Sequence, residues 1–176
     1  ANAGKWKDHG SPTRIENSQL VGGMDMLTTL ESFNEADAMA SVDASSDAEA
    51  AIVLRYHDPD NYVVALYTPS LKSMYIHDRR DGNWGAPLGR VDVPKLGPNI
   101  HLVAATCGEY AAILLTDGIE SYHTPIVQIE NGKPGKVGLW HYHVGDRQAF
   151  DNFEVSPTSF LPTDLLSGDG PRRVAL

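Results

Sequence analysis

The stretch AEAAIVLRYHDPDNYVVALYT, residues 48–68, decides the fold. It contains two apolar runs, residues 51–56 and 62–67, which are rich in the β-branched and aromatic residues that strands favour. The five residues between them, 57–61, are polar and include Pro59. Proline fixes its own φ, and Asp and Asn side chains hydrogen-bond the neighbouring backbone, so this segment predicts the turn of a β-hairpin.

The two faces of the first predicted strand differ in character. Side chains alternate along a strand, so Ile52, Leu54 and Tyr56 point one way, and Val53 and Arg55 point the other way. The pattern predicts a sheet with one face on a hydrophobic core and one face that presents polar groups. Arg55 is then a cation on the polar face.

The rest of the chain also reads as short strands separated by turn residues, with no convincing helix. The first ten residues are polar, and we expect them to be loose, with Trp6 as their anchor. Regular short strands predict an all-β fold, an antiparallel two-sheet β-sandwich or jelly roll. We expect one domain over residues 1–156, followed by a tail or linker over residues 157–176, where the composition changes. The further predicted strands are residues 14–21, 26–33, 34–43, 71–77, 88–93, 99–107, 109–116, 119–126, 137–143 and 149–155.

Charge excludes one class of partner. The 176 residues carry 14 Lys and Arg against 23 Asp and Glu, a formal net charge of −9. Nucleic-acid binding needs a basic stripe, and the sequence has none, so no nucleic-acid partner is expected. The negative net charge also disfavours anionic polymers such as pectate or alginate, unless calcium or a local basic patch intervenes. No apolar run is long enough to cross a membrane, so no membrane insertion is expected, and the lone Cys107 is read as a small buried hydrophobe.

Three segments carry a resemblance to a known family. They are Arg55-Tyr56 followed by Asp58-Pro59-Asp60-Asn61-Tyr62, then Lys136-Val137-Gly138-Leu139-Trp140, and then Ala149-Phe150-Asp151-Asn152-Phe153-Glu154-Val155. In this order they resemble the concanavalin A-like or laminin-G-like sandwich domains of secreted glycan-processing proteins, over residues 36–156. The resemblance implies the fold and a secreted or periplasmic location. It does not select an activity, because this fold hosts lectins, carbohydrate-binding modules, lyases and hydrolases.

Aromatic and polar side chains of the predicted sheet are candidates for a glycan site. An aromatic face can cover the C–H side of a sugar ring, while charged or amide groups hold its hydroxyls. The alternative is that these side chains belong to the core or rim of the sandwich. The candidates are Arg55, Tyr67, Tyr75, His77, His123, Trp140 and Tyr142, with Tyr122 beside them.

Two candidate metal sites can be read from the sequence. The resemblance implies a structural calcium ion (Ca²⁺) held by Asp151 with oxygens from the first strands. The run His141-Tyr142-His143 places two imidazoles on one strand face, which with His123 or His77 would suit a transition metal. No carboxylate or cysteine stands at a diagnostic spacing, so exposed histidines near a turn explain that run equally well.

Catalysis has little support in the sequence. No Glu-x-Asp-x-x-Glu strand pattern and no Gly-x-Ser-x-Gly elbow occurs. We therefore predict a non-catalytic carbohydrate-binding domain, whose partner is an oligo- or polysaccharide and which can belong to a larger parent chain with other modules. One alternative is a polysaccharide lyase or glycoside hydrolase that uses Arg55, His123 and Tyr142. The other is a structural or protein-interaction domain.

Overall fold

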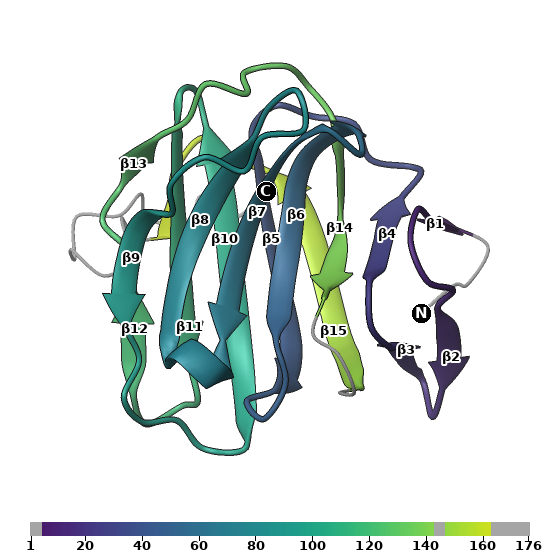
Figure 1. Cartoon of the computed structure of the whole chain (residues 1–176), viewed down its shortest axis with the longest axis vertical. Coiled ribbons are helices and arrows are strands. Elements are labelled where there is room, and N and C mark those ends of the chain that lie inside the picture. Colours follow the sequence, from purple (N-terminus) through teal and green to yellow (C-terminus); the bar gives the residue numbers. More distant parts are fainter. Residues whose placement is uncertain (1–4, 143–146, 163–176) are drawn as a thin grey trace, which may run out of the picture.

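The computed structural model describes residues 5–142 and 147–162 as an all-β, antiparallel, two-sheet sandwich. The two sheets lie one in front of the other in Figure 1. This confirms the predicted fold class.

The first sheet has seven strands. The hairpin predicted over residues 48–68 lies at its centre as β6 and β7, joined by a two-residue turn because Asp58 pairs with Asn61. In spatial order the strands are β1 (Trp6–Asp8), β4 (Met26–Leu30), β14 (Lys136–His141), β6 (Ala50–Asp58), β7 (Asn61–Thr68), β8 (Ser73–Arg79) and β9 (Leu88–Asp92).

The second sheet has eight strands. β5 at its centre alternates buried and half-buried residues along its whole length, which is the pattern of a strand with one face on the core. In spatial order the strands are β12 (Ser121–His123), β11 (Tyr110–Thr116), β10 (Asn99–Cys107), β5 (Ala38–Ser45), β15 (Gln148–Pro157), β3 (Gln19–Gly22) and β2 (Arg14–Glu16), with β13 (Val127–Gln128) also paired to β11.

The main core fills the space between the sheets. Ile52 and Leu54 of β6 enter it from the first sheet, and Val42 of β5 and Leu102 of β10 enter it from the second. A second apolar cluster lies on the outer face of the seven-stranded sheet, where Val53 and Leu66 are completely or almost completely buried. The prediction of a polar face on β6 is therefore wrong, because β6 and β7 are apolar on both sides.

A β-bulge at Arg55 interrupts the alternation of β6. Arg55 has a φ of 52°, in the left-handed region, and the pairing of β6 with both neighbours shifts at this point. The extra residue turns Tyr56 to the outer face, whereas strict alternation predicted it beside Leu54. Gly135 permits the bulge, since a Cβ there would lie only 2.5 Å from the carbonyl carbon of Arg55.

Several predicted boundaries change. Residues 6–8, expected to be loose, form β1 against β4. The predicted strand 14–21 is two strands, because Asn17 and Ser18 both take positive φ and form a turn. Residues 69–71 form a 3₁₀ turn ahead of β8.

The last described residues follow β15 across the outer face of the eight-stranded sheet. Leu161 is 5% exposed and packs with Ala105 and Ala112. The predicted boundary at residue 156 stays a prediction, and most of the predicted tail lies outside the described residues. Among those described, no helix is long and apolar enough to cross a membrane.

Candidate functional site

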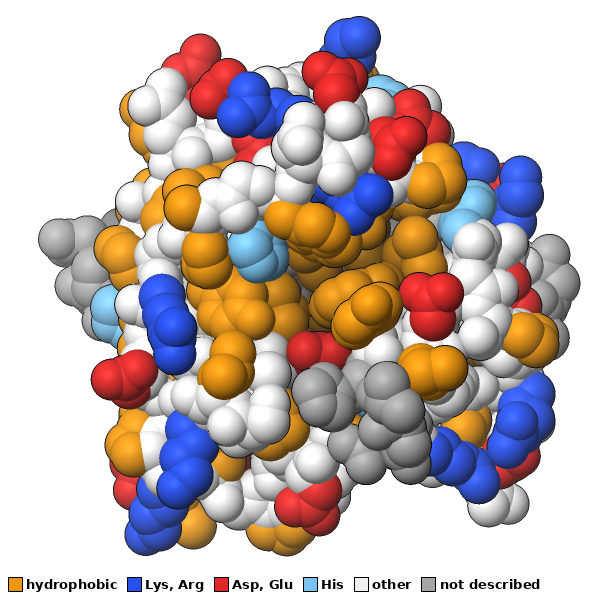
Figure 2. Space-filling view, viewed as in Figure 1, with side chains coloured by type: hydrophobic (Ala, Val, Ile, Leu, Met, Phe, Trp, Pro, Cys, Tyr) orange, Lys and Arg blue, Asp and Glu red, His pale blue; other side chains and the backbone are white. Residues whose placement is uncertain are grey.

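A cleft of about 540 Å³ opens on the outer face of the seven-stranded sheet. Figure 2 faces this sheet and shows the hollow near the centre of the view, with hydrophobic side chains gathered in it. Side chains of β4, β7, β8 and β14 form the floor. The loop between β8 and β9 forms one wall, and residues 9–10 and Asp25 form another. We call this cavity the aromatic cleft.

Trp84 is the centre of its aromatic cluster. The indole ring lies 5.8 Å from the ring of Tyr62, 5.4 Å from His77 and 5.9 Å from Trp140, all as centroid distances. Trp140 and Tyr142 are two residues apart at the end of β14, and their rings are nearly parallel at 13° with centroids 5.6 Å apart. Tyr142 is 56% exposed, so the cluster ends in an aromatic face that solvent reaches.

The wall that carries Trp84 is tied to β8. His77 donates from Nδ1 to the carbonyl oxygen of Trp84 at 3.1 Å. The guanidinium of Arg79 lies over the indole, 4.5 Å from the ring centroid, a cation–π contact. Arg80 and Asn83 exchange backbone hydrogen bonds that close the loop. The indole is therefore held in place before any ligand arrives.

Glu49 supplies a carboxylate to the cleft. It directly precedes β6 and is 6% exposed. Its Oε1 accepts a hydrogen bond from the Thr68 hydroxyl at 3.1 Å, and its Oε2 accepts one from the backbone N–H of Tyr142 at 3.1 Å. These bonds connect the ends of β6, β7 and β14.

Most titratable rings of the cleft are held uncharged at neutral pH. Burial lowers the pKa of His77, although its bond to the Trp84 carbonyl opposes the shift. Burial also lowers the pKa of His9, helped by the charge of Lys7. Burial raises the pKa of Tyr62, and it raises the pKa of Tyr56, which lies outside the cleft lining but contacts His9, to about 12. The cleft thus presents neutral rings around few formal charges.

The structure brings four of the predicted glycan-binding residues together. Tyr75, His77, Trp140 and Tyr142 all line the aromatic cleft. Tyr75 and His77 share one face of β8 with their rings 5.3 Å apart. Strand alternation predicted each of these two pairs, and the pairing of the strands brings the pairs to one cleft.

The structure corrects the predicted place of Arg55. Its side chain is 1% exposed and lies away from the cleft, because the bulge turns it inward. Its guanidinium donates to the carbonyl oxygens of Ala36, Asn131 and Gly108 at 2.6–2.7 Å and pairs with Asp37 at 3.2 Å. Burial lowers the pKa of Arg55 against the opposing charge of Asp37. Arg55 therefore serves as a structural link between loops.

Three other predicted positions also lie away from the cleft. Tyr67 is 5% exposed in the core between the sheets, where burial raises its pKa. His123 lies on β12, the edge strand of the eight-stranded sheet. Tyr122 beside it packs on the core and donates its hydroxyl to the carbonyl of Lys95 at 3.0 Å.

Sequence reasoning missed Glu49, Trp84, Tyr62, Arg79 and His9 as cleft residues. Trp84 stands in a loop, and no periodicity says which sheet face a loop covers. One available signal was the unbroken apolar run of β6 and β7. Such a run is typical of strands that are covered on both faces, which pointed to a wall over the outer face.

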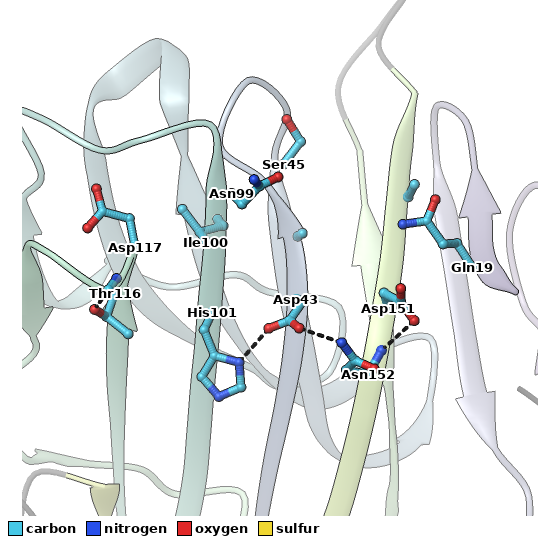
Figure 3. Close-up of a pocket in the computed structure, with 13 residues that line it drawn as sticks. Gln19, Asp43, Ser45, Asn99, Ile100, His101, Thr116, Asp117, Asp151 and Asn152 are labelled. Atoms are coloured by element: carbon cyan, nitrogen blue, oxygen red, sulfur yellow. Dashed lines mark hydrogen bonds and ion pairs between the residues drawn. The ribbon is translucent and has the colours of Figure 1, made fainter. Parts of the chain in front are cut away.

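A second cavity, of about 580 Å³, lies on the outer face of the eight-stranded sheet. Figure 3 shows its polar side chains, which come from β3, β5, β10, β15 and the turn after β11. Asp43 accepts from His101 Nδ1 at 2.6 Å and from Asn152 Nδ2 at 2.7 Å. Burial alone would raise the pKa of Asp43, but these bonds outweigh it and lower the pKa. We call this cavity the polar trough.

The predicted calcium ligand lies between this trough and a third cavity. Asp151 stands opposite Asp43 in the pairing of β15 with β5, and its Oδ1 accepts from the backbone N–H of Asn152 at 2.8 Å. Within the described ranges no group of three or more His, Cys, Asp or Glu side chains could hold a metal ion. Calcium prefers several hard oxygens, and the oxygens of Asp43 are already engaged, so the donor set around Asp151 is thin.

The predicted histidine metal site is not assembled. His141 is completely buried and donates from Nδ1 to the carbonyl of Glu49 at 3.0 Å. His77 belongs to the aromatic cleft and His123 to the far edge of the other sheet. His143 lies outside the described residues.

Comparison by sequence gives no relatives. A scan against protein-family models finds no match, and a search of curated proteins finds none at the threshold used.

Comparison by structure finds many neighbours. The carbohydrate-binding module CBM66 from Bacillus subtilis is similar with a TM-score of 0.72 and 14% identity, over 86% of this chain and 95% of that one. The GH43 protein BlXynB from Bacillus licheniformis gives 0.62 and 15% identity, over 88% of this chain but only 37% of that longer one. The exoplasmic/lumenal domain of VIP36, in a form bound to Ca²⁺ and Man3GlcNAc, gives 0.57 and 9% identity, over 88% and 84%. At these identities the likeness establishes the fold, and this chain is an antiparallel β-sandwich of the concanavalin A-like type.

Proposed function

We propose that this chain is a carbohydrate-binding domain that holds a glycan in the aromatic cleft without changing it chemically. The observation that carries the proposal is the meeting of an exposed aromatic face, the ring of Tyr142 stacked on the buried Trp140, with polar groups in one preformed cavity. An aromatic face packs on the C–H side of a sugar ring, and the polar groups hydrogen-bond its hydroxyls. The cavity volume falls in the range of about 300–1,000 Å³ that is usual for small-molecule sites.

Two structurally similar proteins also support this proposal. CBM66 is described as a carbohydrate-binding module and matches along nearly its whole length. The VIP36 domain has the same fold and was solved with Man3GlcNAc. Because fold alone does not imply function, the proposal rests on the cleft first and on these neighbours second.

Two further features follow as parts of the proposal. We place the domain outside the cytoplasm, in a secreted or periplasmic protein, in line with the exoplasmic/lumenal VIP36 domain of the same fold. We also propose that it works beside other modules, in line with the BlXynB chain, of which the matched part is only about a third.

Calcium at Asp151 stays a prediction. Its support is the Ca²⁺-bound VIP36 domain and the nearness of Asp151 and Asp43; against it stands the thin donor set. Thermal unfolding of the wild type, measured with millimolar calcium and again with a chelator, tests the calcium site. An ion that binds only the folded state raises Tm. An unchanged Tm in both conditions contradicts the site.

The experiment for the function is a glycan screen with the purified chain, followed by a cleavage assay on every hit. We expect binding without product. Tyr142→Ala should weaken glycan binding about tenfold or more, because it removes the aromatic face on which we expect the sugar to pack. Tyr110→Ala is the matched control, because Tyr110 is 48% exposed but lies on β11 of the other sheet.

Three results would overturn the proposal. Product formation would establish the lyase or hydrolase alternative. Absence of any hit would favour the structural or protein-interaction alternative. Equal losses of glycan affinity in Tyr142→Ala and Tyr110→Ala would show that the binding site is not the cleft.

A further inference from the structure

We propose that the aromatic cleft selects uncharged sugars over acidic ones, and that Glu49 makes this selection by accepting hydrogen bonds from sugar hydroxyl groups. This inference rests on the proposed function and names the class of ligand for the same site.

The bonds around Glu49 fix it as an acceptor. The only hydrogen of the Thr68 hydroxyl goes to Glu49 Oε1 at 3.1 Å. The Tyr75 hydroxyl lies 3.4 Å from the same Thr68 oxygen, so Tyr75 must be the donor in that contact. The result is a one-way chain of hydrogen bonds, from Tyr75 through Thr68 to the carboxylate. A chain of this kind polarises each of its members and holds the carboxylate in one orientation.

Glu49 keeps capacity for a ligand. An ionised carboxylate has about four lone-pair sites, and Thr68 and the Tyr142 backbone occupy one on each oxygen. The side chain lines the cleft, although little of it is exposed. Within residues 5–142 and 147–162, no Lys, Arg or His forms an ion pair with Glu49. A ligand at this position must therefore donate, as a sugar hydroxyl does.

The charges that surround the cleft oppose an anion. Among the described residues that line the cleft, Asp25 and Glu49 are acidic and Arg79 is basic. The guanidinium of Arg79 is partly engaged: it pairs with Asp60 at 3.3 Å and lies over the face of Trp84, while its buried Nε has no hydrogen-bond partner among the described residues. His9 and His77 have lowered pKa values and offer no compensating charge at neutral pH. A uronate, sulfate or phosphate group in the cleft would be repelled by the carboxylates of Glu49 and Asp25.

The test is calorimetric titration of the purified chain with two panels of ligands. The neutral panel holds manno-, gluco-, xylo- and fructo-oligosaccharides, and the acidic panel holds galacturonate and mannuronate oligomers of the same length. The variants are Glu49→Gln, which keeps the shape and removes the charge, and Glu154→Gln as the matched control. Glu154 is an exposed residue of β15 on the other sheet.

For the wild type we expect the best neutral ligand to bind at least tenfold more tightly than any acidic one. Glu49→Gln should weaken neutral binding about tenfold and narrow the neutral-to-acidic ratio, while Glu154→Gln changes neither. A second measurement on the wild type alone covers the case in which Glu49→Gln does not fold. Raising the salt from about 0.01 M to 1 M shortens the Debye length from about 30 Å to 3 Å, so the neutral-to-acidic ratio should fall.

The outcomes separate the inference from the proposed function. If Tyr142→Ala lowers the affinity for neutral ligands but Glu49→Gln does not, the inference about Glu49 is overturned. The proposed binding function is then still supported. The inference is also overturned if the wild type prefers uronates at low salt, or if salt does not change the ratio of neutral to acidic affinity. Neither result contradicts the binding function. No binding in either panel overturns the proposed function itself.

Discussion

The two outer faces of this sandwich differ although both carry a cavity of similar size. The floor of the aromatic cleft is formed by β4, β7, β8 and β14, and Val53, Val64 and Leu66 on the same sheet face are completely or almost completely buried. The polar trough covers β5, β10 and β15, where the outward positions of β5 are half-buried and include Ser41 and Asp43. Neither face is a bare solvent surface, but only the first combines stacking surfaces with acceptors.

The difference shows which burial pattern marks a sheet face that is covered by other parts of the chain. β5 alternates strictly between buried and half-buried residues, which is the pattern of a strand with water on one side. β6 is buried at seven successive positions and β7 at seven. An antiparallel strand that loses its alternation needs a cover on its second face, and here the cover is the wall that carries Trp84.

The largest expected effect is at the bulge that makes the faces unlike. Arg55→Leu removes the buried guanidinium that donates to the carbonyl oxygens of Ala36, Asn131 and Gly108 and pairs with Asp37, so we expect a loss of about 3–5 kcal/mol in the free energy of unfolding. Urea denaturation measures it. Arg90→Leu, an exposed arginine of β9, should change stability by less than about 0.5 kcal/mol. Similar small losses for both variants would show that Arg55 is not the link described here.

A large effect on binding is expected at the cleft wall. Trp84→Ala removes the ring that touches Tyr62, His77 and Trp140, so glycan affinity should fall about 30-fold or more, the factor that corresponds to 2 kcal/mol. His101→Ala in the trough should leave affinity unchanged. Calorimetric titration of both variants compares the two faces directly. If only His101→Ala weakens binding, the ligand occupies the trough.

A smaller effect is expected in the trough. Asp43 and His101 are both more than 40% exposed, so Asp43→Asn should lower stability by only about 0.5–1 kcal/mol at pH 7. The pKa of Asp43 is lowered on folding, so its contribution is present above the ordinary pKa of 3.8 and is lost as the pH falls through the folded value. Denaturation from pH 7 to pH 3 should show wild type and variant converging. A constant gap would assign the loss to packing.

The smallest effect is a pH dependence of the cleft. The pKa of His77 is lowered on folding, so below the ordinary value of 6.5 the unfolded chain takes up a proton that the folded chain resists. Stability of the wild type should therefore fall as the pH drops below 6.5, and His77→Gln should make that slope shallower. The check is Tm measured from pH 8 to pH 5. Parallel curves would mean that His77 is charged in the folded state too.

Much of this fold could be predicted from local pattern. The hairpin, the short strands and the sandwich follow from alternation and turn residues, and the pairs Tyr75–His77 and Trp140–Tyr142 follow from strand parity. The bulge at Arg55 could not be foreseen, because arginine seldom takes a positive φ and its partners come from loops distant in sequence. The sequence did not point to Glu49 for the same reason, because its role depends on contacts with Tyr142 and Thr68, which lie at the ends of two neighbouring strands. Sequence reasoning found side chains that share a strand and missed those that meet between strands.

In both sheets, one of the inner strands comes late in the sequence and is therefore synthesised after its two neighbours. β14 lies between β4 and β6, and β15 lies between β5 and β3. A nascent chain that has not reached these strands exposes the hydrogen-bonding edges of four others, and such edges invite pairing with other chains. Long-range pairings are slow to form, so we expect the cleft, which joins His9 to Tyr142, to be completed late in folding. A glycan that binds there would then recognise only finished molecules, and its binding could be used to count them.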